Sequence, residues 1–257
     1  IYHLHVKVLT RSKGHSALKA SAYRAGADLR DLDGSAISYS RRQDAEALFI
    51  YTRSNHPDCD WVYDRQSLWA SIERAEKRKD AQLAREVEFA LPIELCRQDQ
   101  RSCALRMAEY ITSKFDVPLD ISIHYKEGNP HCHILIPLRT LGPDGWGQKI
   151  REMNRKEFVL ELRKAWQDIA NEYLAGIARI DCRSYEEQGI KKVPQKHLGK
   201  RLYKYIKRYI IKGIVKMAGR VLADTSRPEV LEWLAKNGYG PTPKADPQPA
   251  PEPQQPE

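Results

Sequence analysis

The segment Ile121–Leu138 (ISIHYKEGNPHCHILIPL) constrains the fold of this chain more than any other. Two largely apolar stretches flank a polar turn, and this pattern predicts two antiparallel strands folded back on each other. Glu127 and Gly128 are expected at the centre of the turn, because glycine adopts turn conformations without steric cost. With that centre, His124 lies directly opposite His131 on the paired strand.

The hairpin would gather three histidines. His131 and His133 share a face, since alternate residues of a strand point the same way. His124 joins them because opposed residues in an antiparallel pair point to one side, whereas a one-residue slip would move it to the other. Three converging imidazoles suit a divalent metal ion. Two histidines at this spacing are often half-exposed residues that bind no metal. The third histidine makes metal binding the favoured interpretation. The enzyme class stays open, because hydrolases, oxygenases and nucleases all use three-histidine sites.

Composition indicates the class of partner. The 257 residues carry a formal net charge of +9, which favours a polyanion such as nucleic acid, although a basic, unspecialised surface is the alternative. Five scattered cysteines without a CxxC pair predict neither a disulfide framework nor a cysteine zinc site, and they suit a reducing cytosol. No apolar run is long enough for a membrane span, and no signal peptide is visible.

Hydrophobic periodicity predicts an alternation of strands and helices. Tyr23 falls on the first expected helix, and Glu86 and Glu88 share one face of the second expected strand. No sustained periodicity is found over Ala27–Asp64, and a loop is expected over Gly142–Gly147. Strands are expected over Ile1–Leu9 and Arg85–Pro92, and helices over Ala17–Gly26, Gln66–Asp80, Gln98–Phe115, Lys156–Leu174 and Arg183–Gln188.

The C-terminal part differs in character. Lys200–Leu222 holds eight lysines or arginines interleaved with apolar residues, which predicts a basic amphipathic helix. Such a helix could track phosphates, lie on a membrane surface, or pack on the domain with a solvated basic face; we favour nucleic-acid contact. Gly240–Glu257 is rich in Pro, Gln and Glu, which predicts a disordered tail or linker.

A tyrosine, a glutamate pair and three histidines in a basic chain suggest phosphodiester chemistry. A metal ion on a non-bridging oxygen polarises the phosphate. Tyrosine is a poor nucleophile while protonated, because its reference pKa is about 10. A metal-held phosphate and a nearby carboxylate would relieve that difficulty. A tyrosine ester also conserves the energy of the broken bond, so that the strand can later be rejoined.

Several segments together resemble the MobA/MobL family of plasmid mobilisation relaxases, within the HUH endonuclease superfamily. The matching segments are IYHLHVKV, SALKASAYRAG, REVEFALP, HYKEGNPHCHILI, and RIDCRSYEEQGI followed by VPQKHLG. Their order and spacing agree over Ile1–Gly199. The resemblance implies an α+β fold with a central antiparallel HUH or palm-like sheet of about five strands. Helices would pack mainly on one side, with the metal site on the exposed face.

The resemblance also implies roles for individual residues. Tyr23 matches the nucleophile that keeps the DNA 5′ end as a phosphotyrosine. Glu86 matches the strand glutamate that orients a ligand or acts as base, with Glu88 as the second choice. The metal ligands would be His124, His131 and His133. The expected ion is Mn²⁺ or Mg²⁺, because phosphate chemistry usually runs with these ions, although imidazoles also accept Zn, Ni and Cu.

The implied function is site- and strand-specific nicking at a plasmid transfer origin. The substrate would be single-stranded DNA, often with an adjacent hairpin. Accessory relaxosome proteins and the coupling protein of a type IV secretion system are possible partners, in the cytoplasm of a plasmid-bearing bacterium. Ser35–Lys79 matches the family pattern poorly, and Lys200–Leu222 lies beyond the matched region. The candidate phosphate contacts lie in these stretches: Arg41, Arg42, Lys204, Lys207 and Arg208.

The expected organisation is a relaxase domain over residues 1–199, a basic helical extension over residues 200–239 and a tail over residues 240–257. Three alternatives remain open. A rolling-circle replication initiator or a transposase would cut DNA with the same kind of site but would serve replication or transposition instead of plasmid transfer. A non-catalytic DNA-binding protein could hold the metal structurally. A histidine-metal hydrolase of small molecules fits the high positive charge less well.

Overall fold

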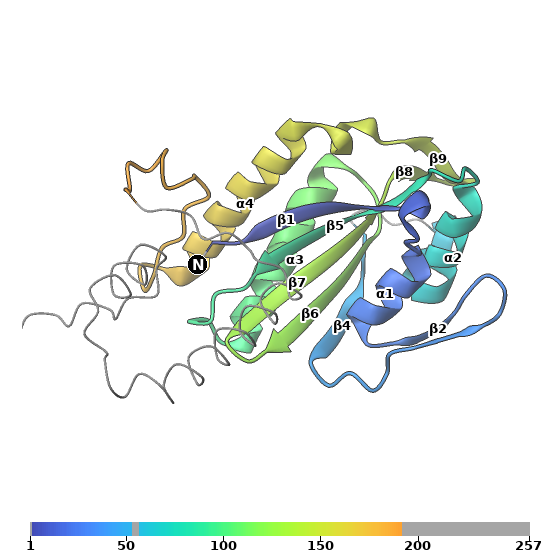
Figure 1. The fold of residues 1–257 in the computed structure, drawn as a ribbon, viewed down its shortest axis with the longest axis horizontal. Helices are drawn as coiled ribbons and strands as arrows, with labels where there is room; N and C mark the ends of the chain where they lie inside the picture. Colours follow the sequence, from blue (N-terminus) through green and yellow to red (C-terminus); the bar gives the residue numbers. More distant parts are fainter. Residues whose placement is uncertain (1, 53–56, 192–257) are drawn as a thin grey trace, which may run out of the picture. The chain divides into compact units, whose positions relative to one another are not determined.

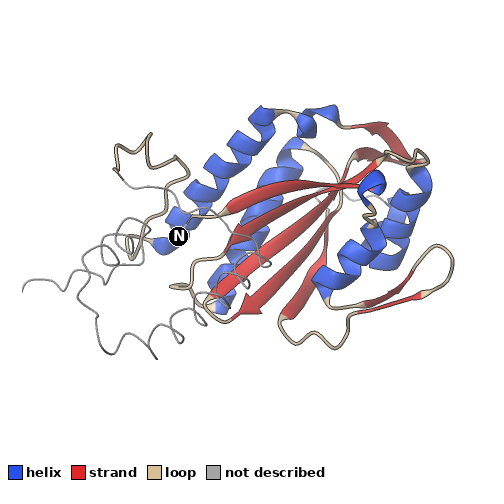
Figure 2. Cartoon of the chain, in the orientation of Figure 1, coloured by secondary structure: helices blue, strands red, loops and turns tan. Residues whose placement is uncertain are grey.

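A five-stranded antiparallel sheet forms the centre of the fold (Figures 1 and 2). The computed structural model describes residues 2–52 and 57–191, and its contacts define one compact unit over Ile1–Ile190. The strand order is β1-β5-β7-β6-β4, so the histidine hairpin lies inside the sheet and not at its edge. The strands are β1 (Leu4–Thr10), β5 (Gln82–Ala90), β7 (Asn129–Pro137), β6 (Leu119–Lys126) and β4 (Ala45–Tyr51).

The register of the hairpin is the predicted one. His124 of β6 pairs with His131 of β7, and the turn uses Gly128 at a φ of 67°. On the other side of β7, Glu88 of β5 pairs with His133. Because every pair is antiparallel and in register here, the three histidines and Glu88 point to one face of the sheet.

The opposite face of the sheet holds the main hydrophobic core. Two long helices cover it: α3 (Arg97–Lys114) and α4 (Lys156–Leu174). Fully buried side chains from alternate strand positions face them, including Val87, Phe89 and Ile134. Each such side chain contributes about 1.5–3 kcal/mol through its removal from water.

Two shorter helices lie on the histidine face. They are α1 (Ala17–Ala25) and α2 (Arg65–Ala75). Ser16 is the N-cap of α1, since its Oγ accepts a hydrogen bond from the backbone N–H of Lys19 at 3.2 Å. The helices bury side chains such as Leu135 at the end of the sheet that is remote from the hairpin turn. The α+β prediction is therefore confirmed: within residues 2–52 and 57–191, the long helices lie on one side of the sheet, and the short helices leave the histidine end of the other side partly uncovered.

Strand β4 and two small hairpins were not predicted. β4 forms the edge of the sheet beside β6, and its pairing is irregular between Ala47 and Ile50, so its sequence shows no clean alternation. The small hairpins are β2 (Asp28–Arg30) with β3 (Ala36–Ser38), and β8 (Arg139–Gly142) with β9 (Gly145–Lys149). The second pair replaces the loop expected over Gly142–Gly147.

The short helix predicted over Arg183–Gln188 is wrong, because this segment forms turns. Glu187 accepts hydrogen bonds from the N–H and hydroxyl of Ser184, as it would at the start of a helix. Gly189 then adopts a φ of 71°, which ends the helical path within one turn. The remaining short 3₁₀ segments are Arg11–Lys13, Pro57–Tyr63 and Arg151–Asn154.

Some predictions concern the C-terminal part, beyond residue 191. The basic helix Lys200–Leu222, the tail Gly240–Glu257 and the expected boundaries at 199/200 and 239/240 all lie outside the described residues. Within the described part, no helix combines the length and the apolar character needed to cross a bilayer.

Candidate active site

The three predicted histidines form one cluster on the face of the sheet beside α1. Their ring centroids are 5.1 Å apart for His124 and His131, 4.4 Å for His124 and His133, and 4.9 Å for His131 and His133. One nitrogen from each ring lies within 4.8 Å of the other two. His124 and His133 are buried and His131 is half-buried, so the cluster opens to solvent on the side of His131.

The outward nitrogen of each ring has an oxygen partner. His124 Nε2 lies 2.8 Å from the carbonyl oxygen of Arg24, and His131 Nδ1 lies 2.8 Å from that of Asn129. His133 Nδ1 lies 2.7 Å from the carboxylate of Glu86. Carbonyl and carboxylate oxygens only accept hydrogen bonds, so each outward nitrogen carries the proton. In a neutral imidazole the inward nitrogen is then unprotonated, and its lone pair points into the cluster.

This arrangement fits a metal ion. The inward nitrogens of His124 and His133 are 3.2 Å apart, and without a cation their lone pairs would repel each other. Two nitrogens that bind one ion at about 2.1 Å lie about 3.0–3.4 Å apart in octahedral or tetrahedral geometry. Oxygen partners that fix the tautomer and orientation of each ring are also typical of metal-binding histidines.

Burial favours the neutral form of His124 and His133. Desolvation lowers the pKa of His124 to about 4 and also lowers the pKa of His133, in the second case against the nearby carboxylate of Glu86. A neutral imidazole is the form that binds a metal ion, so at neutral pH both side chains need lose no proton before ligation.

Glu86 contacts His133 and two positively charged side chains, Arg24 and Lys7. It is fully buried, and it accepts hydrogen bonds from His133 and, at both carboxylate oxygens, from the guanidinium of Arg24. Lys7 Nζ lies 3.1 Å from Glu86 and 3.3 Å from Glu88. Burial would raise the pKa of Glu86, but the hydrogen bonds from His133 and Arg24 outweigh it and hold this pKa well below its usual range.

Glu88 is the more exposed of the two glutamates. Its side chain is 26% exposed, and its carboxylate lies 4.0 Å from His133 Nδ1. Burial opposes the ionisation of Glu88, but the neighbouring His133 and Lys7 lower its pKa nonetheless. Glu86, at 2.7 Å from His133 Nδ1, therefore makes the closer contact with the histidine cluster, and Glu88 pairs with Lys7 at 3.3 Å.

Tyr23 lies beside the histidine cluster at the C-terminal end of α1. Its side chain is 45% exposed, and its ring stands edge-on to His124 at a centroid distance of 6.3 Å. The next residue, Arg24, contacts His124 through its carbonyl and Glu86 through its side chain. The sequence predicted that Tyr23 and the histidines would meet, and the structure brings them together.

Two buried carboxylates fix α1 in place. Asp120 of β6 accepts hydrogen bonds from Ser21 Oγ at 2.5 Å and from Trp69 Nε1 at 2.8 Å. Glu73 of α2 accepts one from the backbone N–H of Ala17 at 2.6 Å, at the positive end of the α1 dipole. The helix that carries Tyr23 is thus tied to the sheet and to α2 by charge-assisted hydrogen bonds.

The sequence did not single out Arg24 or Lys7. Both pair with Glu86 from other elements, and only the tertiary structure brings these charges together. The one local signal is the position of Arg24, directly after Tyr23. Of the predicted phosphate contacts, Arg41 is exposed and Arg42 is packed on Tyr23. The other predicted contacts lie outside the described residues: Lys204, Lys207 and Arg208.

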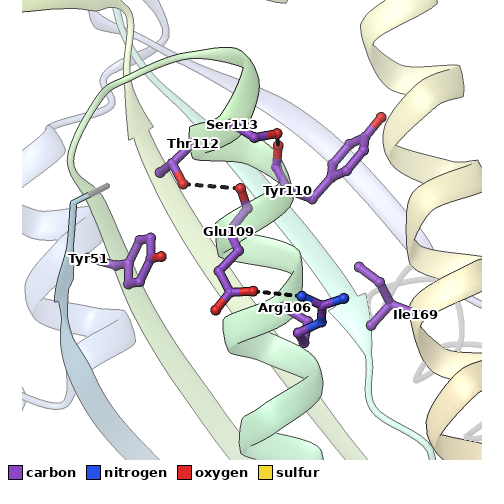
Figure 3. Close-up of a pocket in the computed structure, with 7 residues that line it drawn as sticks. All are labelled: Tyr51, Arg106, Glu109, Tyr110, Thr112, Ser113 and Ile169. Carbon is purple, nitrogen blue, oxygen red and sulfur yellow. Dashed lines mark hydrogen bonds and ion pairs between the residues drawn. The ribbon is translucent and has the colours of Figure 1, made fainter. Parts of the chain in front are cut away.

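A separate hollow of about 400 Å³ lies on the opposite face of the sheet, between β4, α3 and α4 (Figure 3). Arg106 and Glu109 form an ion pair of 3.0 Å in it, and Tyr51 and Tyr110 lie on its two sides. It contains none of the histidines, so it is not part of the candidate active site.

Glu86→Gln should weaken Mn²⁺ binding by about 10–100-fold, because an amide holds the His133 ring less firmly and makes its inward nitrogen less basic. Isothermal titration with Mn²⁺ measures the change. Glu88→Gln is the matched control, one strand repeat away on the same face, and its effect should be several-fold smaller. An equal or larger loss in the control would transfer the orienting role to Glu88.

Comparisons with known proteins identify the family of this chain. Residues 15–208 match the MobA/MobL family. Mobilization protein MobL of Acidithiobacillus ferridurans is 31% identical over 238 residues, covering 77% of this chain and 62% of that protein. Mobilization protein A of Escherichia coli is 34% identical over 221 residues, covering 77% of this chain and 29% of that protein. The chain therefore spans less than two thirds of either relative.

A solved structure supports the same fold. It is described as "Molecular Basis of Vancomycin Resistance Transfer in Staphylococcus aureus". It superposes with a TM-score of 0.64 and 29% sequence identity, covering 72% of this chain and 100% of that one. The family resemblance of the sequence segments is thus confirmed over most of the described residues.

Proposed function

The chain belongs to the MobA/MobL family, and from this premise we propose that it is the DNA-nicking part of a plasmid mobilisation protein, a relaxase. The substrate is single-stranded DNA at the transfer origin of a plasmid. The observation that carries the proposal is the exposed ring of Tyr23 beside three histidines whose inward lone pairs converge.

The reaction exchanges one phosphodiester for another. The phenol oxygen of Tyr23 attacks the phosphorus of the scissile phosphate and loses its proton. A bond forms between that oxygen and phosphorus, the bond from phosphorus to the 3′ oxygen breaks, and the 3′ oxygen takes up a proton. One fragment ends in a 3′-hydroxyl and the other in a 5′-phosphotyrosine. Since bond types are conserved, a second 3′-hydroxyl can reverse the step and rejoin the strand.

The residues around Tyr23 divide the remaining tasks. The inward nitrogens of His124, His131 and His133 would hold a divalent metal ion. When bound, the ion supplies positive charge to a non-bridging oxygen of the phosphate. Glu86 orients His133, and its lowered pKa makes it a weak base, which favours the orienting role over proton abstraction.

Among the candidate ions, the ligand set favours Mn²⁺ over Mg²⁺. All three protein ligands are imidazoles, and Mg²⁺ prefers oxygen ligands and keeps its waters. Mn²⁺ accepts nitrogen ligands and still supports phosphate chemistry. The other proposed partners, accessory relaxosome proteins and a coupling protein, follow from the family alone, as does action in the bacterial cytoplasm.

The experiment for this function uses labelled single-stranded oligonucleotides that span the transfer origin of the plasmid that encodes the chain. With Mn²⁺, one strand should be cut at one position. In a denaturing gel, the cut fragment that carries a 3′ label should migrate with the protein, and the cut fragment that carries a 5′ label should run free, because the protein holds the new 5′ end. The complementary strand is the control and should stay intact. Cleavage of both strands at many positions would identify a general nuclease, and binding without any cut would favour the non-catalytic alternative.

The names of the two relatives favour a role in plasmid mobilisation over a role in replication initiation or transposition. Both are named as mobilization proteins, not as replication initiators or transposases. The charge of the chain also suits a polyanion better than a small neutral substrate, since +9 would attract phosphates and make binding sensitive to salt.

A further inference from the structure

Arg42 contacts the proposed nucleophile in two ways. Its guanidinium carbon lies 4.3 Å from the centroid of the Tyr23 ring, which is a cation–π distance. Its Nη1 also donates a hydrogen bond of 2.8 Å to the backbone carbonyl of Tyr23. One side chain thus holds both the ring and the end of the helix that carries it.

Asp44 fixes the orientation of this guanidinium. Its carboxylate accepts hydrogen bonds from Arg42 Nε at 3.0 Å and from Arg42 Nη2 at 2.6 Å. The carbonyl of Asp44 in turn accepts from the backbone N–H of Tyr125, next to His124 on β6. A planar guanidinium held at two points by one carboxylate has little freedom to turn toward another anion.

The chain around Arg42 also packs closely on the end of α1. Gly26 adopts a φ of 60°, and a side chain there would lie 3.2 Å from Ala45 Cβ and 3.6 Å from Arg42 Cβ. Tyr39 packs against another side of the Tyr23 ring, edge-on to it at a centroid distance of 5.3 Å. Tyr23 is exposed toward solvent but confined by Tyr39, Arg42 and His124 in the other directions.

The neighbouring Arg41 behaves differently. It is exposed, and no hydrogen bond or ion pair of its side chain is found within residues 2–52 and 57–191. The two adjacent arginines therefore have different surroundings. All three guanidinium nitrogens of Arg42 donate hydrogen bonds to Asp44 or Tyr23. The guanidinium of Arg41 is available for an external anion.

We propose that Arg42, oriented by Asp44, is a positioning residue that holds the ring of Tyr23 against the histidine cluster, and that it is not a DNA-phosphate contact. This inference rests on the proposed function, in which Tyr23 is the nucleophile. Tyrosine has two side-chain torsions, and a phenol oxygen displaced by about 1 Å loses up to about a hundredfold in rate. Arg42 and Asp44 restrict these torsions without touching the substrate.

The test separates rate from affinity. Arg42→Gln should lower the single-turnover rate at saturating oligonucleotide by about 10–100-fold, while the Kd for DNA stays within about twofold. Arg42→Lys should lose rate as well, since an ammonium group lacks the planar fork that spans Asp44 and the Tyr23 carbonyl. Arg41→Gln should instead raise the Kd, reduce the slope of log K against log salt by about one, and be overcome by more DNA.

Asp44→Asn tests the pair without removing the arginine. It should slow the reaction in the same direction, and the double variant Arg42→Gln/Asp44→Asn should be no slower than Arg42→Gln alone, because both changes remove one arrangement. If Arg42→Gln fails to fold, as judged by its unfolding transition, Asp44→Asn and Arg42→Lys carry the test.

The chain offers a matched control at Arg78, which binds Asp80 through Nε and Nη2 at 2.9 Å with the same two-residue spacing. This pair is exposed, beyond the end of α2, so Arg78→Gln should change neither rate nor Kd. The inference is overturned if Arg42→Gln raises the Kd and lowers the salt slope while the saturated rate is unchanged. If the wild-type protein forms no adduct, or if Tyr23→Phe still cuts, the proposed function itself fails.

Discussion

Tyr23→Phe is expected to lower nicking by at least about a thousandfold and to abolish the covalent protein–DNA adduct, because the variant has no nucleophilic oxygen. Phenylalanine retains the ring, so the contacts with Tyr39, Arg42 and His124 can persist. Among the described residues, the Tyr23 hydroxyl makes no hydrogen bond, so its removal leaves no buried group unpaired. DNA affinity should therefore stay within about twofold of the wild-type value.

The measurement is a single-turnover cleavage assay with labelled oligonucleotide, resolved on a denaturing gel, alongside binding by fluorescence anisotropy. Tyr39→Phe is the matched control, because this tyrosine packs against Tyr23 and has no proposed chemical role. It should cut within a few-fold of wild type. A Tyr23→Phe protein that still cuts at a comparable rate would make water the nucleophile. Loss of the adduct only in the Tyr39 variant would move the nucleophile to that residue.

The second large effect concerns the histidines. His131→Ala and His133→Ala should each weaken Mn²⁺ binding by more than about a hundredfold, because removal of a ligand costs more than the 10–100-fold typical of an outer-shell partner. Cleavage should fall by a similar or larger factor, and excess EDTA should stop cleavage by the wild-type protein. Binding is measured by isothermal titration with Mn²⁺, and cleavage in the same buffer with and without chelator.

His5→Ala is the control for these two variants. His5 is exposed on β1, paired with Glu88 on the adjacent strand, and lies outside the cluster of three histidines. It shares the face of the sheet with them, so it reports any general effect of losing an imidazole there. Mn²⁺ affinity and cleavage should be nearly unchanged in this variant. Cleavage at full rate by the wild-type protein in excess EDTA would show that the reaction needs no metal ion.

The histidine cluster could be predicted from sequence because its geometry is local. His124, His131 and His133 belong to one hairpin, and a turn centred on Glu127 and Gly128 fixes which residues face each other. The long helices were predicted for a similar reason: the helix predicted over Lys156–Leu174 has the bounds of α4 because its apolar spacing persists over many turns.

Other parts of the site depend on contacts that are distant in sequence. β4 is recognisable as a strand only through its pairing with β6, since its bulge breaks the alternation. The partners of Glu86 come from α1 and β1, and neither Arg24 nor Lys7 carries a local signal of that pairing. Arg41 and Arg42 look alike in the sequence, and only Asp44 and Tyr23 distinguish them in the fold. Local patterns predicted the long helices and the convergence of the three histidines, and contacts distant in sequence determine the surroundings of Glu86 and Arg42.

The central claim is that the phenol of Tyr23 and a metal ion held by the three histidines act on one phosphate. Peptide mass mapping of the covalent product tests it most directly, after the wild-type chain has reacted with single-stranded origin DNA and Mn²⁺ and been digested with trypsin. DNA is expected on the peptide of residues 20–24 (ASAYR), and on no peptide when EDTA is present from the start. DNA on any other peptide, or cut DNA with no modified peptide, would contradict the central claim.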